Sequence, residues 1–585
     1  MKKRAIAAIL AVVVMASSIC ACAAQSGQAK AEETAKETEA AAAEADAPEG
    51  AEAAEKTAAE EGAATEAEEV KTEAETEPAV SEEKAENGPV PVFTLEEHNF
   101  HSSDTLEGEN VTFARGTFEA IRLTDEAKAA YPALDLALGT FDEEQSKLTR
   151  EAFEEVLEAA ETFLNDYNEE LINFSSGEMS MKIEPVRCDR EILSFFYSNS
   201  SYYPGAAHGL LGYGSCNFIT ATGEPVALTD VVTDLSALAP AVAKNLTAIA
   251  DGSPVEDTED QVKEYFDQNS ESLVWVLDRD GIVFRFAPYE LAPYAMGTLE
   301  SRITFAENPD LFTGKYTAVK GAFTRYLEPF RQNMLDINGD GKAEHILMDG
   351  VYDIDADLFA YTGIELDVDQ SGCMEEAYFY EMKAVLMHTE DGRNYVYAQT
   401  GSDNDYTTLY LFEITDDGPY SIDKLDGMGF ASSFLEDDDA SDAQSPYEQS
   451  GYANRYVVLD PSRFVLNKQT NLMSTYDATR EYGVGEDGMP VPHTDYYEIN
   501  GKRVLTSLQS MEVDLVDPAT GELTGETAEL PEGTGCTLWH TNGEDTVDLL
   551  MEDGRAFRVE VSGSWPQTVN GIDLEKAFEG TMFAG

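Results

Sequence analysis

The chain has 585 residues and a formal net charge of -75, with 113 acidic against 38 basic side chains. A surface this acidic repels phosphate groups, so the composition argues against nucleic-acid partners and against adsorption to bare anionic lipid. The length suits several domains, each large enough to bury its own core.

The N-terminus has the layout of a secretory signal. A basic patch at residues 2–4 precedes an apolar run that is too short for a membrane span, which takes about 20 residues. Residues 19–22 read Ile-Cys-Ala-Cys and resemble a bacterial lipobox, which implies cleavage before Cys22 and lipid on its thiol. We therefore expect residues 1–22 to be a lipoprotein signal peptide. The protein would be lipid-anchored in the cell membrane, facing the extracellular or cell-wall side; an ordinary cleavable signal is the alternative.

Residues 23–92 are expected to form a disordered acidic tether. The segment consists almost entirely of Ala, Glu, Thr and Lys, with hardly any large apolar residue. Such a composition cannot bury enough surface to offset the entropy lost on ordering. Its like charges repel and extend it, so it would hold the folded part away from the membrane. The rest of the mature chain has no apolar run long enough to predict a transmembrane helix.

Residues 93–308 predict an α+β domain, because helical and strand-like patterns are mixed and the strands lie next to each other in sequence. The predicted helices are 148–167, 231–250 and 262–268, and the predicted strands are 179–197, 213–220, 275–277 and 283–286.

Cys188 and Cys216 flank what the sequence suggests is a long hairpin, at nearly equal distances from its tip. This placement favours a cross-strand disulfide, with buried, inert thiols as the alternative.

Three segments of this region resemble the extracellular domain of RsiV-type anti-sigma factors, which is shared with the N-terminal part of PdaC-type peptidoglycan deacetylases. They are Arg187–Tyr197 leading into Tyr203–His208, Asn217–Gly223 with Leu228–Asp230, and Phe286–Gly297. Ala206 stands where that family commonly has Gly. The resemblance covers about a third of the chain and implies an exported, wall-associated domain, which binds lysozyme in the anti-sigma branch. Neither the sigma-binding segment with its membrane span nor the deacetylase catalytic domain has a counterpart here.

His208, Tyr289 and Tyr294 are the candidate ligand-binding residues of this domain. A histidine beside Gly-rich turn residues can contact a ligand, and the two tyrosines beside prolines can form an aromatic rim for a peptide or a glycan. Structural roles are the alternative: a hydrogen-bonding histidine, and rings that cover the edge of a sheet.

The middle region, residues 309–495, carries a calcium-type loop. Oxygen-bearing side chains stand at positions 1, 3, 5 and 9 of the segment that begins at Asp336, and a glycine at position 6 permits a tight turn. This spacing winds hard oxygen donors around one point, which suits Ca²⁺. It departs from the EF-hand because position 12 is Leu347. The predicted ligands are Asp336, Asn338, Asp340, Lys342 through its carbonyl, and Glu344. A turn that joins strands without metal is the alternative.

A fainter copy of this motif follows, with Asp367, Asp369, Ser371 and Glu375 as weaker metal candidates. Around both motifs, short runs of β-branched and aromatic residues predict antiparallel β structure. In residues 496–585, strand-like pieces separated by turns resemble a small SH3-like barrel. The predicted fold is thus multidomain: an α+β RsiV-like domain followed by mainly antiparallel β regions.

These features favour a non-catalytic cell-surface lipoprotein that binds or senses a wall-associated protein, peptide or glycan, with peptidoglycan, lysozyme or another wall protein as candidate partners. One alternative is a peptidoglycan-acting enzyme or its accessory subunit, although the sequence has no Gly-x-Ser-x-Gly or His-Glu-x-x-His motif. A calcium-stiffened structural spacer is the other.

Overall fold

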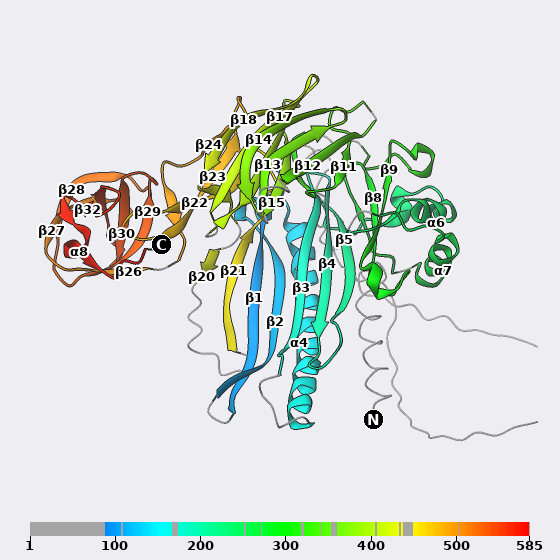
Figure 1. Ribbon diagram of the computed structural model, residues 1–585, viewed down its shortest axis with the longest axis horizontal. Coiled ribbons are helices and arrows are strands. Elements are labelled where there is room, and N and C mark those ends of the chain that lie inside the picture. Colours follow the sequence, from blue (N-terminus) through cyan, green and yellow to red (C-terminus); the bar gives the residue numbers. More distant parts are fainter. Residues whose placement is uncertain are drawn as a thin grey trace, which may run out of the picture.

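The computed structural model describes residues 88–106, 109–166, 174–250, 253–270, 272–317, 321–340, 342–352, 360–403, 406–431, 434–436, 448–501 and 503–583. The signal, Cys22 and most of the predicted tether therefore lie outside the described residues. The described part is mainly β structure, arranged in five sheets with few helices (Figure 1). None of its helices is both long enough and apolar enough to span a bilayer.

A seven-stranded sheet forms the centre of the molecule (Figure 1). Its strands pair antiparallel except for β2 and β3, which run parallel because a long helix connects them. In spatial order the strands are β20 (Phe434–Glu436), β21 (Glu448–Tyr456), β1 (Phe93–Leu106), β2 (Glu109–Leu123), β3 (Gly177–Cys188), β4 (Ile192–Tyr202) and β5 (Leu210–Ile219).

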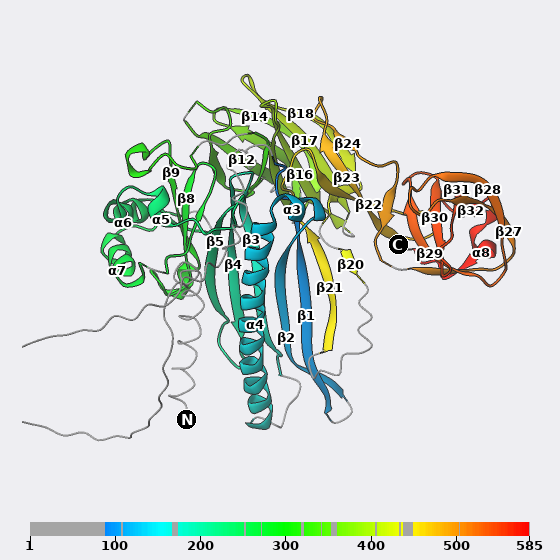
Figure 2. The ribbon, with the colours of Figure 1, turned by 180° about the vertical axis from the view of Figure 1, so that it is seen from behind.

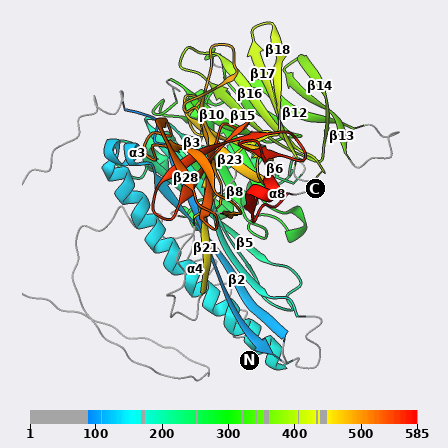
Figure 3. The same cartoon turned by 90° about the vertical axis from the view of Figure 1, so that its left-hand side faces the viewer.

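The connecting helix α4 (Pro132–Asp166) covers one face of this sheet (Figures 2 and 3). It follows the short helix α3 (Asp125–Ala130), and its first residue is a proline, which fits a helix start. Its buried apolar side chains pack on the sheet in two groups spaced three or four residues apart, with the buried polar Gln145 and Thr149 between the groups; they are Leu134, Leu138 and Phe141, then Phe153 and Val156. The sequence predicted only the second half of this helix, because Gly139 and Thr140 weaken helix propensity in the first half.

A four-stranded sheet packs on part of the other face of the central sheet, at β3, β4 and β5. Phe196 of β4 points away from α4 and packs on Val274, Val276 and Val283 of this second sheet. The second sheet in turn packs against two helices. Its strands are β6 (Leu246–Ala248), β9 (Leu299–Thr304), β8 (Gly281–Phe286) and β7 (Trp275–Leu277), and the helices nearby are α5 (Leu228–Val231), α6 (Leu235–Lys244), α7 (Glu259–Asn269), η3 (Tyr294–Met296) and η4 (Pro309–Leu311).

Two further sheets form a β-sandwich around one apolar core. The five-stranded sheet contains β10 (Phe323–Leu327), β15 (Glu381–His388), β16 (Asn394–Gly401), β17 (Thr407–Thr415) and β18 (Gly418–Asp426). The four-stranded sheet contains β11 (Gln332–Leu335), β12 (Glu344–Tyr352), β13 (Tyr361–Val368) and β14 (Ser371–Phe379). Successive side chains of β15 and β16 alternate between this core and a second core on the opposite face.

The fifth sheet runs from that second core into the C-terminal unit. Its first strands are β19 (Met428–Phe430), β22 (Phe464–Thr470), β23 (Tyr476–Val484), β24 (Pro490–Pro492) and β25 (Tyr497–Ile499). Its C-terminal strands are β26 (Val504–Ser507), β27 (Met511–Val516), β28 (Leu523–Leu530), β29 (Gly535–Thr541), β30 (Thr546–Met551), β31 (Ala556–Ser562), β32 (Thr568–Val569), β33 (Ile572–Asp573) and β34 (Phe578–Glu579), with helix α8 (Leu574–Ala577) between the last two.

The sheets do not follow the predicted divisions of the chain. Strand β21 pairs with β1 and β20 pairs with β21, so the chain leaves the central sheet after β5 and returns to it at β20. The core of the C-terminal unit already includes Met473 and Tyr476, upstream of the division predicted at residue 496. The predicted SH3-like barrel is also corrected, because among the described residues this sheet ends at the edge strand β28 and does not close.

The predicted disulfide is wrong: both cysteines are free thiols. Cys188 lies in β3 and Cys216 in β5, and β4 separates these two strands. Cys188 stands opposite Leu193, whereas Cys216 stands opposite Phe195. Burial raises the pKa of Cys188, and its thiol donates to the carbonyl of Pro91, so it belongs to the core.

Candidate functional site

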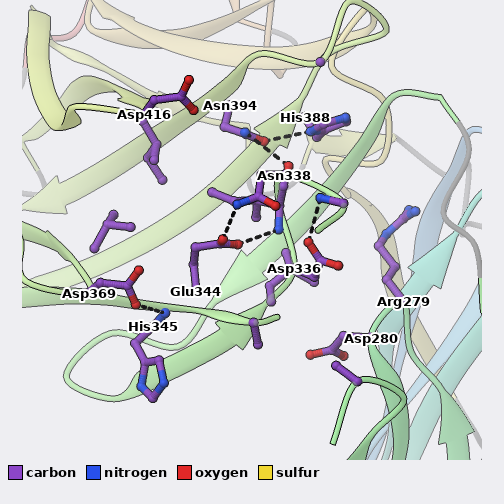
Figure 4. A pocket seen from close by; sticks show the side chains of 18 of the residues that line it. Arg279, Asp280, Asp336, Asn338, Glu344, His345, Asp369, His388, Asn394 and Asp416 are labelled. Atoms are coloured by element: carbon purple, nitrogen blue, oxygen red, sulfur yellow. Dashed lines mark hydrogen bonds between the residues drawn. The ribbon is translucent and has the colours of Figure 1, made fainter. Parts of the chain in front are cut away.

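A cavity of about 1670 Å³ lies between the second sheet and the β-sandwich (Figure 4). One wall is the β7–β8 turn with Arg279 and Asp280, and the opposite wall consists of the β11–β12 loop and the neighbouring sandwich turns. The sequence motif that starts at Asp336 therefore borders the cavity. The polar side chains labelled in Figure 4 are Arg279, Asp280, Asp336, Asn338, Glu344, His345, Asp369, His388, Asn394 and Asp416.

The loop from Asp336 to Glu344 joins β11 to β12 and is curled by its own side chains. The Oδ1 atoms of Asp336, Asn338 and Asp340 accept hydrogen bonds from the backbone N–H groups of residues 339, 340 and 342, at 2.6, 2.8 and 2.8 Å. Glu344 closes the loop by accepting from the backbone of Ile337 and from the side-chain amide of Asn338. All of these hydrogen bonds lie within the loop itself.

The pKa of Glu344 reflects its burial and the charges of its neighbours. Burial raises the pKa of its carboxyl group, and the negative charges of Asp336 and Asp340 act in the same direction. Within the described residues, no three His, Cys, Asp or Glu side chains form a ready-made metal site. Asp336, Asp340 and Glu344, the three carboxylates of the predicted donor set, therefore do not form such a cluster in this structure.

The weaker motif does not wrap around a point. Asp367 and Ser371 lie in β13 and β14, which a two-residue turn joins into a tight hairpin. Asp369 takes the left-handed conformation in that turn, with φ of 54°, and accepts from the backbone N–H of His345. Glu375 stands opposite Ile364, about 10 Å along the ladder from Asp367 at roughly 3.4 Å per residue. Extended pairing therefore separates these side chains.

A chain of contacts links the β11–β12 loop to the central sheet. Asn394 donates to the carbonyl of Ile337 and bonds to His388 at 2.7 Å. The ring of His388 stacks on Phe323, with 4.7 Å between centroids. The guanidinium of Arg279 lies 4.3 Å from the centroid of the Phe323 ring. It also donates hydrogen bonds to Asp189 and to the carbonyl of Cys188.

Beneath the cavity lies a junction of buried ions, which we call the ionic junction. Asp278 and Asp280, from the β7–β8 turn, pair with Arg302 of β9 and Arg325 of β10. The junction also contains Arg187, Asp189 and Arg279. It therefore joins the central sheet, the second sheet and the sandwich through charges that are more than nine-tenths buried, apart from the partly exposed Arg302.

The pKa shifts in the junction follow from burial and pairing. Burial alone would raise the pKa of Asp278, but Arg325 and Arg302 outweigh it and lower the pKa. Asp189 is lowered in the same way by Arg187 and Arg279. Burial lowers the pKa of Arg279 to about 10. These groups hold one another charged, which suits a structural role.

The three candidate ligand-binding residues meet in one aromatic cluster at the surface. The ring of His208, from the β4–β5 turn, stacks on Tyr294 with 4.0 Å between centroids and 22° between planes. Its Nε2 lies 3.3 Å from the hydroxyl of Tyr289, and its Nδ1 lies 2.9 Å from the carbonyl of Gly209. Tyr289 and Tyr294 are 62% and 38% exposed. Most of the Tyr289 ring therefore faces solvent instead of covering the sheet.

The backbone at Tyr289 is held in an unusual conformation. Its φ is 77°, which a bulky side chain rarely adopts. Hydrogen bonds fix the turn: Tyr289 donates its N–H to the carbonyl of Ala292, and Ala287 donates to the carboxylate of Glu290. Tyr265 donates to the same carboxylate from helix α7. Such strain costs about 1–3 kcal/mol and tends to occur at functional sites.

Sequence reasoning missed the ionic junction and the far side of the cavity. Asp278, Arg279 and Asp280 stand together before Gly281, in a hairpin turn that the sequence predicted. Three charges on a turn usually indicate solvent exposure, so the pattern alone gave no sign of burial. His388 and Arg325 lie in the sandwich, and no local pattern shows that its strands pack beside the β7–β8 turn.

Comparisons with known proteins identify one segment. Residues 229–306 match the family model described as "Protein of unknown function (DUF3298)". A DUF3298 family member from Bacteroides fragilis is 17% identical, with a TM-score of 0.29, over 38% of this chain and 96% of its own. A DUF3298 family protein from Pseudomonas aeruginosa is 15% identical, with a TM-score of 0.25, over 40% of this chain and 99% of its own. No curated protein matches the sequence. The segment from α5 to β9 is therefore a DUF3298 domain.

Proposed function

We propose that this protein is a lipid-anchored surface protein that binds a glycan of the cell wall without catalysis. The lipobox-like sequence at Cys22 supports the anchor, and the acidic segment that follows supports a tether. The binding surface is the cluster of His208, Tyr289 and Tyr294. Wall polymers are what a protein anchored on the outer face of a membrane meets first.

The exposed cluster is the observation that carries this proposal. Residues from two distant segments meet with their rings stacked, although neither the sheet nor the helices need them for packing. Aromatic rings present a flat, rigid apolar face with polar edges, which fits the face of a sugar ring and the hydroxyl groups around it. A neutral glycan also escapes the repulsion that a net charge of -75 imposes on anionic polymers.

Co-sedimentation with purified peptidoglycan tests the binding surface. We expect the mature protein to sediment with it, and the double variant Tyr289→Ala/Tyr294→Ala to lose at least tenfold in affinity. Tyr420→Ala is the matched control, because Tyr420 is also exposed but lies in the sandwich. Equal sedimentation of all three proteins would reject the cluster as the binding surface, and release of soluble fragments would favour an enzyme.

The loop from Asp336 to Glu344 is proposed to hold a structural Ca²⁺. The spacing supports the ion: Asp336, Asn338, Asp340 and Glu344 offer side-chain oxygens and Lys342 a carbonyl, and a bound cation would offset the repulsion of Asp336 and Asp340 on Glu344. Bound Ca²⁺ would neutralise these charges and stiffen one wall of the cavity. Calorimetry on chelator-treated protein should show binding that Asp336→Ala abolishes and that Asp416→Ala, an exposed acidic residue on a neighbouring turn, preserves.

Mass spectrometry of the mature N-terminus tests the anchor. A diacylated cysteine at position 22 is the expected end of the chain. An unmodified end that begins downstream of Cys22 would contradict the anchor and leave a secreted protein.

A further inference from the structure

A second group of exposed rings lies on the inserted sandwich, between β10 and β11. Phe330 is 45% exposed and has a φ of 65°, the same left-handed region that Tyr289 adopts. Its backbone N–H donates to the carbonyl of Met348 in β12, which fixes this conformation. A bulky residue with positive φ is an outlier that its surroundings must hold in place, and such outliers cluster at ligand-binding sites.

Phe330 is the outer member of a stack that reaches the sandwich core. Its ring lies 5.2 Å from that of Tyr361 at 25°, and Tyr361 lies 5.0 Å from the buried Phe379 at 23°. Tyr352, which is 51% exposed, meets Tyr361 edge-on at 6.1 Å and 76°. The stack braces Phe330 from behind, so it offers its ring to solvent without needing to reorganise on binding.

We propose that Phe330, Tyr352 and Tyr361 form a second glycan-binding platform, so that the protein holds wall glycan at two places. The inference rests on the proposed function for the nature of the ligand. Both platforms combine exposed rings, a stacked neighbour and one aromatic residue with positive φ. The two are built from different sheets, since Tyr289 follows β8 and Phe330 precedes β11 (Figure 1).

A sugar fits this platform better than a second copy of the chain. Two chains that each carry a charge of -75 repel one another, and the exposed rings are too few for a stable protein interface, which buries about 800 Å² on each partner. A glycan strand is neutral along its sugar faces and offers the same face repeatedly. Two weak sites on one tethered protein then reinforce each other, and avidity can exceed either affinity by about 10²–10⁴.

Calorimetry with a soluble tetramer of N-acetylglucosamine tests the second platform, because a ligand this short occupies one platform at a time. The full mature chain should bind two tetramers. Phe330→Ala and Tyr352→Ala should each reduce the number to one, and so should Tyr289→Ala. Tyr420→Ala should leave it at two. Thermal melting of each variant shows that it is folded, and Tyr352→Ala replaces Phe330→Ala if the latter melts early.

The outcomes separate the two proposals. One site that Tyr289→Ala removes and that neither Phe330→Ala nor Tyr352→Ala changes would overturn the second platform and keep the proposed function. If the wild type binds one tetramer and only Phe330→Ala and Tyr352→Ala abolish that binding, this platform is supported and the proposal that Tyr289 belongs to the binding surface is rejected. A chain that self-associates through Phe330 and binds no tetramer would overturn the glycan platform in favour of a protein contact.

Discussion

The ionic junction and the aromatic cluster are two opposite ways of placing polar and aromatic groups in one protein. In the junction, Asp278 is almost fully buried and each charge has opposite charges beside it. In the cluster, Tyr289 is 62% exposed and its ring contacts His208 and Tyr294. The junction joins three sheets, whereas the cluster presents its groups to solvent.

The difference teaches which residues to regard as functional. Charged side chains that gather beside a cavity resemble a catalytic site, and perturbed pKa values often mark such sites. Here the shifts arise because carboxylates and guanidiniums hold one another in the charged form, which fastens parts of the fold together. The strained, exposed tyrosine has no such structural purpose, so the cluster is the better candidate for recognition.

Breaking the junction should have the largest effect on stability. In Asp278→Ala the guanidiniums of Arg302 and Arg325 lose one of their two buried carboxylate partners, and removal of one member of a buried pair costs about 3–5 kcal/mol. Urea denaturation of Asp278→Ala should show this loss. Asp267→Ala, on the exposed face of α7, serves as the control. A loss below about 1 kcal/mol would mean that the junction does not hold the sheets together.

Calcium should stabilise the sandwich side of the cavity by a smaller amount. A ligand at 100 times its dissociation constant stabilises the folded state by about 2.7 kcal/mol if the unfolded chain does not bind it. Adding Ca²⁺ to chelator-treated protein should therefore raise the melting temperature, and Asp336→Ala should remove the rise. An identical rise in the variant would place the calcium effect elsewhere.

Lowering the pH should weaken the stabilisation from the junction but strengthen the stabilisation from Asp142 on helix α4. The pKa of Asp278 is lowered in the folded protein, so its stabilisation is present above the unfolded value near 3.8 and is lost as the pH falls further. Burial raises the pKa of Asp142 on α4 to about 6, against the opposing effect of Arg122. Between pH 6 and 4 the folded state therefore binds a proton at Asp142 that the unfolded state does not, which stabilises it.

Asp142→Asn isolates this second effect. The variant should lack the gain in stability that wild type shows between pH 7 and 4.5, and its unfolding free energy should be flatter over that range. Melting curves at several pH values measure the difference. Parallel curves for the two proteins would show that Asp142 titrates normally in the fold.

The sequence predicted local features well and distant ones poorly. The hairpin of β7 and β8 and the helix α7 follow from local patterns, and the neighbourhood of Tyr289 and Tyr294 follows from their spacing. No local pattern shows that β21 pairs with β1 after more than 300 residues, or that the sandwich loops lie opposite the β7–β8 turn across the cavity. The long hairpin is present as β4 and β5, but the predicted disulfide failed because Cys188 lies in β3 and β4 separates it from Cys216 in β5.

The substitution Tyr289→Gly tests the central claim most directly, because it separates binding from packing. Glycine adopts a φ of 77° without strain, so the variant should melt no earlier than wild type. It lacks the exposed ring, so its affinity for peptidoglycan should fall at least tenfold, which is about 1.4 kcal/mol. A variant that melts earlier but binds peptidoglycan as wild type does would contradict the account, because Tyr289 would then serve the fold and not the ligand.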